Sequence, residues 1–452
     1  MTKSYDLIVI GAGSAAMSGA LKTASAGWKV AVVDFRPYGG TCALRGCDPK
    51  KMLITAAQLM DDLRRMKGRG VIAPEARVAW RELMDWKRTL TGPVPAKHEK
   101  AFAGKGVDTL HGVARFTGRN TLEVAGAGSF EARHFLIASG AKPVPLGFPG
   151  AEHLMTNEGF LELDELPGRI VLVGGGYIAA EFSHIAAHAG AKVTILQRGE
   201  RMLPSFDADL VGWLMESFAA VGIDVRTSHT VEAVEKTKDG FVVRARAKDG
   251  SVVPVEADLV VHAAGRVPDL DSLSLDAADV DRDERGHIKL NEFLQSVSNA
   301  AVYAAGDAAA VGPPLTPVSS HDAKVVVRNL LEGNKHRPEY RGVPSVAFTI
   351  PPIASVGMNE NEAREKGLKF RTRSQKASDW YTARRVVEPV YGFKVLVEEE
   401  TDLVLGAHLV GPHVDEVINI FALAIRKGLT AEDLKTTMFA YPTGASDIGY
   451  ML

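Results

Sequence analysis

The pattern of apolar and polar positions predicts a strand–helix–strand unit at the start of the chain. Residues 5–10 (YDLIVI) and 29–34 (KVAVVD) are short, mostly apolar runs, and the segment between them is rich in alanine. Short apolar runs bounded by glycine are typical of buried parallel strands, whereas alanine favours a helix. A turn with the sequence GAGSAA, at 11–16, joins the first strand to the helix.

The same pattern recurs at residues 169–198. An apolar strand (RIVLV) leads into GGGYIAAE at 174–181, then an alanine-rich helix and a second apolar strand (KVTIL). Two copies of this unit indicate two Rossmann-like nucleotide-binding folds in one chain.

Alternating segments follow both units. Residues 108–140 and 230–265 alternate polar and apolar positions around turns that contain Gly or Asn, and each ends in an apolar strand with a small-residue turn. This pattern is typical of β-meanders. From about residue 337 the pattern changes, and an amphipathic helix is predicted at 414–427. The predicted fold is therefore α/β, with two Rossmann-like domains and a C-terminal α+β domain.

Composition and charge narrow the classes of function. The 452 residues are 46% hydrophobic and 24% charged, with a formal net charge of -2. Charges of both signs are interspersed, so we expect no nucleic-acid or membrane partner. The apolar runs are too short to span a bilayer, and the N-terminus enters a strand without a signal-type segment. We expect a cytoplasmic protein that acts on a small molecule.

Residue types at the two glycine turns point to dinucleotides. Gly11, Gly13 and Ala16 occupy the three fingerprint positions of the first turn, where small residues allow a tight turn and close approach of the backbone to a pyrophosphate. Asp34 ends the following strand, where a carboxylate accepts hydrogen bonds from a ribose. The phosphate is expected at the helix N-terminus.

The second turn differs at the end of its second strand. Gly174, Gly176 and Ala179 match the fingerprint, but Gln197 replaces the expected acid, and Arg198 and Arg201 follow. A missing acid with nearby guanidinium groups suits a 2′-phosphate, which favours NADPH over NADH. The alternative is that these arginines only solvate a turn.

The chain has two cysteines, Cys42 and Cys47, within GGTCALRGCDPKK at 39–51. Two sulfurs without a nearby histidine do not complete a metal site, so no metal is expected. A structural disulfide would close a small loop and stabilise by about 2 kcal/mol. From spacing alone, redox chemistry and a structural bridge both stay open.

Together these motifs resemble the class I pyridine nucleotide-disulfide oxidoreductases, the family of glutathione reductase, dihydrolipoamide dehydrogenase and mercuric reductase. The resemblance covers nearly the whole chain and includes VYAAGDAA (302–309), LTPV (315–318), FTIPPIASVG (348–357) and LGAHLVGPHVDEVI (405–418). It implies an FAD-binding domain in two parts (1–147 and 266–336), an NAD(P)H-binding domain (148–265) and an interface domain (337–452) that forms a homodimer.

The resemblance also implies the cofactor-binding residues. FAD would bind the first unit, with Asp307 on the flavin's ribityl chain, and NADPH would bind the second. Expected around the first turn are Gly11, Gly13, Ser14, Ala15, Ala16, Asp34, Gly40, Thr41, Ala138, Ser139 and Gly140, with Gly306, Asp307, Leu315, Thr316 and Pro317 further along. Expected around the second are Gly174, Gly176, Tyr177, Ile178, Gln197, Arg198, Arg201, Gly265 and Arg266.

Catalytic roles follow from the same resemblance. Cys47 would lie beside the flavin and Cys42 would meet the acceptor. Either Lys50 or Lys51 would lie near flavin N5, paired with Glu181. Tyr177 would cover the flavin as a lid; the alternative is a packed helix aromatic. Asp48 departs from the family, which usually has Val or Ile there, and a carboxylate beside a thiolate would raise the thiol pKa unless it caps the helix.

The C-terminal segment FAYPTGASD (439–447) also departs from the family. Phe439 and Tyr441 stand where disulfide-reducing members carry two histidines, and Ser446 replaces a glutamate. Tyrosine, with a pKa near ~10, is a poor proton shuttle at neutral pH. Ordinary disulfide turnover should be slow unless another group substitutes, and His321 is one candidate.

We therefore expect an NADPH-dependent FAD flavoprotein with a redox-active Cys42–Cys47 disulfide that reduces a disulfide-type or other small acceptor. Mercuric reductases also carry Phe and Tyr at the histidine positions, but they pass metal through a C-terminal cysteine pair that this sequence lacks. A metal or quinone reductase is the first alternative. A redox-sensing flavoprotein with little turnover is the second.

Overall fold

The computed structural model describes residues 3–452 and divides them into two units that the chain visits alternately. Unit 1 contains the described residues up to Lys50, Trp86–Val144 and Arg266–Tyr340; unit 2 contains Lys51–Asp85, Pro145–Gly265 and Arg341–Leu452. The four-segment domain division stays a prediction, because residues 148–265 and 341–452 fall in the same unit. Two helices pass from one unit to the other: α3 (Cys47–Met66) and α4 (Trp80–Thr91).

Unit 1 is built on one mixed sheet with the strand order β3-β2-β1-β6-β5-β4, and β16 pairs with β6. The strands β1, β2, β3, β6 and β16 are parallel, whereas β4 and β5 form an antiparallel extension. The elements are β1 (Lys3–Ile10), α1 (Ser14–Ser25), β2 (Val30–Asp34), α2 (Gly40–Arg45), α5 (Val94–Ala103), β3 (Asp108–His111), β4 (Ala114–Gly118), β5 (Thr121–Val124), β6 (Gly128–Ile137), β7 (Ala141–Pro143), β15 (Arg266–Pro268), β16 (Val302–Ala304) and α9 (Thr316–Glu332).

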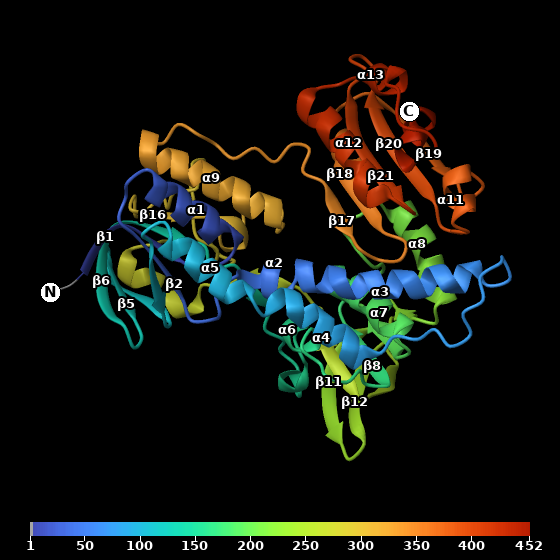
Figure 1. The fold of residues 1–452 in the computed structure, drawn as a ribbon, viewed down its shortest axis with the longest axis horizontal. Coiled ribbons are helices and arrows are strands. Elements are labelled where there is room, and N and C mark those ends of the chain that lie inside the picture. The colour runs from blue at the N-terminus through green and yellow to red at the C-terminus, as the bar shows by residue number, and fades with distance from the viewer. Residues whose placement is uncertain (1–2) are drawn as a thin grey trace. The chain divides into compact units, whose positions relative to one another are not determined.

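Both faces of this sheet are buried, which explains why residues 7–10 of β1 are all apolar. Leu7 and Val9 pack in the core beneath α1 and α9, whereas Ile8 and Ile10 pack in the core on the opposite face. Strands covered on both faces have nearly continuous apolar sequences. Helices α1 and α9 lie side by side in this unit (Figure 1).

Unit 2 contains a parallel sheet of order β10-β9-β8-β14, an antiparallel sheet β11-β12-β13 and a five-stranded antiparallel sheet β17-β18-β21-β20-β19. Its elements are α6 (Asn157–Phe160), β8 (Arg169–Val173), α7 (Tyr177–His188), β9 (Lys192–Leu196), α8 (Ala208–Ala220), β10 (Asp224–Arg226), β11 (Thr230–Thr237), β12 (Gly240–Arg246), β13 (Val252–Ala257), β14 (Leu259–His262), β17 (Ser345–Ala347), β18 (Ile353–Gly357), α10 (Glu360–Glu365), β19 (Phe370–Lys376), α11 (Tyr381–Arg385), β20 (Gly392–Glu398), β21 (Val404–Val410), α12 (Val414–Lys427), α13 (Ala431–Thr436) and α14 (Ile448–Met451).

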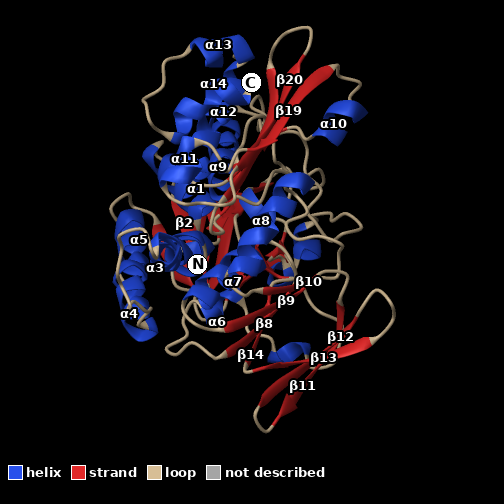
Figure 2. Cartoon of the chain, turned by 90° about the vertical axis from the view of Figure 1, so that its right-hand side faces the viewer, coloured by secondary structure: helices blue, strands red, loops and turns tan. Residues whose placement is uncertain are grey.

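Helix α12 packs against the five-stranded sheet, and its bounds match the helix predicted at 414–427 (Figure 2). Val414, Val417, Ile418 and Phe421 recur at helical spacing and are buried. Gly428 ends the helix in the left-handed conformation, with φ 68°. Apolar residues three and four apart on one helical face are the usual basis for such packing.

A buried network of charged side chains in unit 2 anchors the second half of α3. The Asp61 carboxylate accepts hydrogen bonds from Arg65 Nε at 2.7 Å and lies 3.3 Å from His188 Nε2 on α7. Arg65 also lies 3.7 Å from the Glu388 carboxylate. Burial opposes ionisation of Asp61, but the bonds from His188 and Arg64 hold its pKa well below its usual range. The network therefore fixes the helix whose first residue is Cys47.

Glu388 shows the opposite shift within this network. Burial raises its pKa to about 7, although the Val390 N–H and Arg65 favour the charged form.

No helix among residues 3–452 combines the length and apolar composition needed to cross a lipid bilayer.

Candidate functional site

The first glycine turn, in unit 1, is built for close approach of backbone. Gly11 has φ 107°, and a Cβ on it would lie 2.3 Å from the carbonyl oxygen of Ala138. Gly13 forms the N-cap of α1 with no capping side chain, and the first turn of this helix has no acidic residue. The first N–H groups of a helix have no intrahelical partners, so this end is suited to bind an anion.

Asp34 holds the turn to the end of β2. Its carboxylate accepts the Ala12 N–H at 2.8 Å and the Arg36 N–H at 2.9 Å. Burial raises the pKa of Asp34, and these two backbone bonds partly oppose that shift. A carboxylate has about four acceptor positions, so two are left for a ribose.

The residues around this turn fit an FAD-like ligand. The Ser139 hydroxyl oxygen is buried and has no hydrogen-bond partner within residues 3–452. A Cβ on the next residue, Gly140, would meet nothing within 4 Å, so this turn borders open space. Burial raises the pKa of Asp307, and the charge of Arg266 opposes that shift. Buried polar groups normally have partners, so an unsatisfied hydroxyl in a cradle indicates a polar ligand.

The other residues predicted for this cofactor also lie in unit 1. Gly40 begins α2 with φ 69°, and a Cβ on it would lie 2.4 Å from Gly13 Cα, so the dithiol segment packs directly on the glycine turn. The remaining ones lie at the starts of α1, α2 and α9, at the end of β6 or beside Asp307: Ser14, Ala15, Ala16, Thr41, Ala138, Gly306, Leu315, Thr316 and Pro317.

The two cysteines lie on consecutive helices of this segment. Cys42 is half-buried in α2, Cys47 is the exposed first residue of α3, and no disulfide joins them in the described residues. Cys47 Sγ lies 3.6 Å from Thr316 Oγ1, and the Cys42 thiol donates to Asp48 Oδ1 at 3.8 Å. The hydrogen bond with Cys47 and burial raise the pKa of Cys42 far above its usual value. Within residues 3–452, no three His, Cys, Asp or Glu side chains are grouped to hold a metal ion.

The second glycine turn, in unit 2, has nearly the same local geometry as the first. Gly174 has φ 119°, and a Cβ on it would lie 2.2 Å from the Ala263 carbonyl oxygen. The N-cap of α7, Gly176, has φ -89° and ψ -162°, and the N-cap of α1 has φ -88° and ψ -162°. Neither helix has a capping side chain or an acid in its first turn. Both turns therefore offer the same anion site.

The structure separates the roles of the two arginines after β9. Arg201 donates to the carbonyl oxygens of Phe206 at 2.7 Å and Pro204 at 2.6 Å. Its own carbonyl accepts the Gln197 side-chain amide at 3.2 Å. Arg198 is exposed, and its guanidinium has no hydrogen bond or ion pair within the part of the chain that the structure describes. The Arg198 guanidinium is thus exposed and unengaged within the described residues, whereas Arg201 holds the loop that follows β9.

Tyr177 and Glu181 lie on α7 in unit 2. The ring of Tyr177 packs edge-on against Phe206, with 5.5 Å between centroids, and burial raises the tyrosine pKa. Glu181 is buried, and its carboxylate accepts the Phe348 N–H at 2.9 Å. Ile178 packs on the core of the unit, Gly265 ends the second segment of unit 2, and Arg266 begins the third segment of unit 1.

The two candidate lysines have different environments. Lys51 is half-exposed, lies 3.4 Å from the Asp415 carboxylate and sits 3.6 Å above the Phe348 ring. Lys50 is buried, with 8% of its surface exposed. Lys51 is therefore held at the surface of unit 2, and Lys50 is the better candidate for a role in the protein interior.

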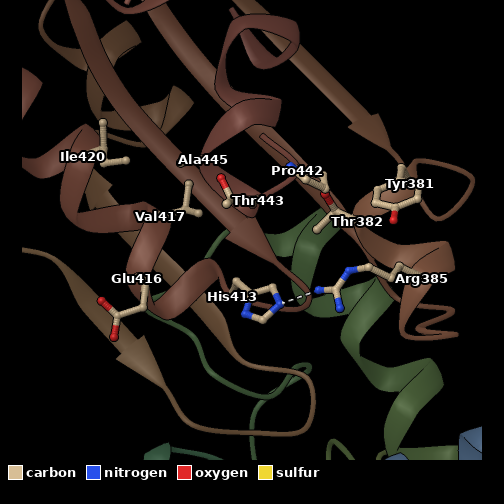
Figure 3. A pocket seen from close by; sticks show the side chains of 11 residues that line it. Tyr381, Thr382, Arg385, His413, Glu416, Val417, Ile420, Pro442, Thr443 and Ala445 are labelled. Atoms are coloured by element: carbon tan, nitrogen blue, oxygen red, sulfur yellow. Dashed lines mark hydrogen bonds between the residues drawn. The ribbon is translucent and has the colours of Figure 1, made fainter. Parts of the chain in front are cut away.

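Residues 442–445 of the C-terminal segment 439–447 help to line a pocket of about 380 Å³ in unit 2. Tyr441 is 82% exposed, whereas Phe439 packs on the core. Ser446, at the position of the family's glutamate, donates to the Thr443 carbonyl at 2.6 Å. The sequence does not single out Arg385 and His413, which also line the pocket and lie next to each other, with Arg385 Nη2 3.3 Å from His413 Nε2 (Figure 3). The only sequence feature that could have drawn attention to them is that His413 directly precedes the predicted helix α12.

His321 does not have the contacts of a proton shuttle. Its Nε2 accepts the Glu339 N–H at 3.1 Å, and its ring meets the Tyr340 ring edge-on. The imidazole is thus engaged in packing α9 against the segment that follows it.

Two glycine turns of one design and a dithiol segment on the first of them define a two-nucleotide redox fold. The chain matches the family described as pyridine nucleotide-disulphide oxidoreductase over residues 5–323 and the dimerisation domain of the same family over residues 343–451. The chain belongs to the pyridine nucleotide-disulphide oxidoreductase family. It is accordingly an FAD-dependent oxidoreductase with a nicotinamide nucleotide as electron donor, and the predicted α/β fold is confirmed.

Individual relatives differ in their acceptors. Mercuric reductase of Staphylococcus aureus is 33% identical over 447 residues, covering 98% of this chain and 81% of the relative. Glutathione reductase of Burkholderia cepacia is 33% identical over 443 residues, covering 98% and 97%. The Cu(II) complex of the HOCl-induced flavoprotein disulfide reductase RclA from Escherichia coli is similar with a TM-score of 0.88 and 28% identity, covering 100% and 99%.

Proposed function

We propose that this protein is an NADPH-dependent FAD dithiol reductase in which Cys42 and Cys47 pass an electron pair to a small acceptor. The carrying observation is that the dithiol segment packs on the first glycine turn through the Gly40–Gly13 contact. A redox-active thiol pair that packs against a nucleotide-binding turn is well placed to exchange electrons with the cofactor bound there.

FAD, when bound, supplies a two-electron carrier between the nicotinamide and the disulfide. The N–H groups at the start of α1 would hold its pyrophosphate, Asp34 a ribose and Asp307 the ribityl chain. We assign the family's flavin-side lysine to Lys50. The N–H groups at the start of α7 would hold the pyrophosphate of NADPH, and Arg198 its 2′-phosphate. Family membership and a dimerisation domain support a homodimer.

The acceptor is one whose reduction does not require an imidazole from the C-terminal segment as proton donor. The sequence has no histidine after His413, and Tyr441 is exposed to solvent. A disulfide-type or other low-molecular-weight electrophile is our first candidate. Reduction of a thiophilic metal ion, or of a quinone, is the second, because a mercuric reductase is among the relatives and RclA has been solved as a Cu(II) complex.

Anaerobic stopped-flow reduction tests the function. We expect NADPH to bleach the flavin absorbance faster than NADH does, and a long-wavelength thiolate-to-flavin band to appear. Cys47→Ser should lose that band, whereas Cys42→Ser should keep it. Absence of reduction by either nucleotide would refute the proposal. In a steady-state screen over disulfides, quinones and metal ions, rapid reduction followed by a stall with every acceptor would instead identify a redox sensor.

A further inference from the structure

An acidic side chain lies beside the half-buried cysteine. Asp48 is in the first turn of α3 and is exposed, and its Oδ1 accepts a hydrogen bond from the Cys42 thiol at 3.8 Å. Both residues belong to unit 1, and the contact joins α2 to α3. Asp48 thus touches both the thiol and bulk water.

Cys42 needs a base, because its surroundings favour the protonated thiol. The hydrogen bond with Cys47, burial and the charge of Cys47 all raise the pKa of Cys42, and the negative charge of Asp48 adds to them. Only the hydroxyl of Thr316 acts in the other direction among these groups. Since the thiolate is the nucleophile, the proton on Cys42 must leave when the thiol reacts.

Three of the groups near Cys42 can be compared as proton acceptors. Cys47 is the thiol that must later attack Cys42 Sγ, so it is not free to hold the Cys42 proton during the step, and Thr316 is a neutral hydroxyl. The Asp48 carboxylate already accepts the Cys42 hydrogen bond and can exchange a proton with solvent. A general base must lie within hydrogen-bond reach of the proton that it takes, and Asp48 meets this condition.

We propose that Asp48 is the acid–base residue for Cys42, in place of the imidazole that the C-terminal segment lacks. The inference rests on the proposed function and names a further catalytic residue for it. Asp48 accepts the Cys42 proton during attack on the acceptor and returns it to the leaving group.

The step balances for a low-molecular-weight disulfide. A bond forms between Cys42 Sγ and one substrate sulfur, the substrate S–S bond breaks, and the leaving thiolate takes the proton that Asp48 received. Cys47 then attacks Cys42 Sγ as a thiolate, which closes the protein disulfide and releases the second substrate thiolate, and that thiolate takes a proton from solvent. The protein dithiol loses two electrons, and the substrate gains two electrons and two protons.

The test compares two rates, cystamine reduction and Cys42 alkylation. If Asp48 acted only through its negative charge, its removal would raise both rates. The holoprotein is reduced chemically and mixed with cystamine, a dicationic disulfide, and cysteamine release is followed over one turnover between pH 5 and 9. In parallel, the rate of Cys42 alkylation by iodoacetamide is measured by peptide mass spectrometry. Variants are Asp48→Asn, Asp48→Glu and the control Asp62→Asn, which lies on the same helix.

We expect Asp48→Asn to slow cystamine reduction at least about tenfold, because the carboxylate that takes and returns the proton is gone. Alkylation should slow less, because iodide leaves without a proton. Asp48→Glu should recover much of the reduction rate, and Asp62→Asn should change neither. Faster cystamine reduction in Asp48→Asn, in parallel with alkylation, would overturn the proposal. An equal fall in both rates would also overturn it, because the carboxylate would then have no role in protonating the leaving group. Failure of NADPH reduction would count against the proposed function alone, because this assay does not use NADPH.

Discussion

Thr316 Oγ1 lies 3.6 Å from Cys47 Sγ, although the two residues are 269 positions apart in the chain. The chain passes through unit 2 between them and returns to unit 1 with the segment that contains α9. The hydroxyl at the start of this helix therefore depends on the whole third segment of unit 1 for its position. It is the one neutral group that favours the thiolate of Cys42.

Thr316→Val should slow alkylation of Cys42 by iodoacetamide severalfold at pH 7. Valine keeps the branched shape but removes the hydroxyl whose hydrogen bond lowers the Cys42 pKa. The matched control is Thr436→Val, whose hydroxyl bonds only to carbonyl oxygens of its own helix. Equal alkylation rates in the parent and Thr316→Val would show that the contact does not affect the thiol.

Gly176→Ala should fold normally but bind NADPH at least about tenfold more weakly. A Cβ at Gly176 would meet no protein atom within 4 Å, and its φ of -89° suits alanine. The methyl group would instead occupy the space where the backbone approaches the pyrophosphate. Titration of nucleotide fluorescence measures the affinity, and Gly212→Ala, an equally open glycine on α8, is the control. Unchanged affinity for NADPH would show that the nucleotide does not bind at this turn.

Arg198→Ala should lower kcat/KM for NADPH by about tenfold to a hundredfold and leave kcat/KM for NADH nearly unchanged. A hydrogen bond to a charged group contributes about 1.5–3 kcal/mol, and only NADPH carries the 2′-phosphate. Arg201→Ala should instead lower stability, because that guanidinium binds two backbone carbonyls. Equal losses with both nucleotides in Arg198→Ala would contradict the assignment.

Asp61→Asn should lower the free energy of unfolding by about 3–5 kcal/mol, because Arg65 loses its most buried charged partner and His188 loses the same carboxylate. Asp62→Asn, which pairs with the same arginine from a half-exposed position, should cost less than about 1 kcal/mol. The side chains of Asp61 and Asp62 are 4% and 49% exposed. Urea unfolding followed by circular dichroism gives both values, and similar losses would argue against an anchoring role for Asp61.

Glu388 should make stability decline as pH rises through neutrality. Its pKa is raised from 4.5 to about 7 by folding, so its favourable contribution is complete below about pH 4.5 and is lost as pH rises through 7. The groups that face it are Arg65, Arg64, Asp61 and the Val390 N–H. In urea unfolding, Glu388→Gln should gain stability relative to the parent between pH 5 and pH 8. Glu365→Gln, on the exposed face of α10, should show no such change.

Much of the fold could be predicted because its signals are local. The glycine turns, the meanders and α12 each follow from residues within a few positions of one another, and the bounds of α12 match the prediction. The anchoring of α3 could not be predicted, because His188 and Asp61 are 127 positions apart and Arg65 contacts a carbonyl 321 positions away. Contacts between residues so far apart in the chain produce no periodic pattern in the sequence from which they could be predicted.

The candidate site shows the same division. Asp34 and the open Gly176 lie where the fingerprint places them, since their roles depend on the local turn. By contrast, Arg198 and Arg201 look equivalent in the sequence, and only the backbone carbonyls of Phe206 and Pro204 distinguish them. The same holds for Lys50 and Lys51, whose difference arises from Asp415 and Phe348.

The matching N-cap angles of Gly13 and Gly176 mean that both helices begin with the same backbone geometry toward a phosphate. Under the proposed function, the two nucleotides are then distinguished at the strand ends, by Asp34 in one copy and by Gln197 with Arg198 in the other. A protein engineer who wishes to change the electron donor could therefore exchange that short peptide alone and leave both phosphate loops as they are.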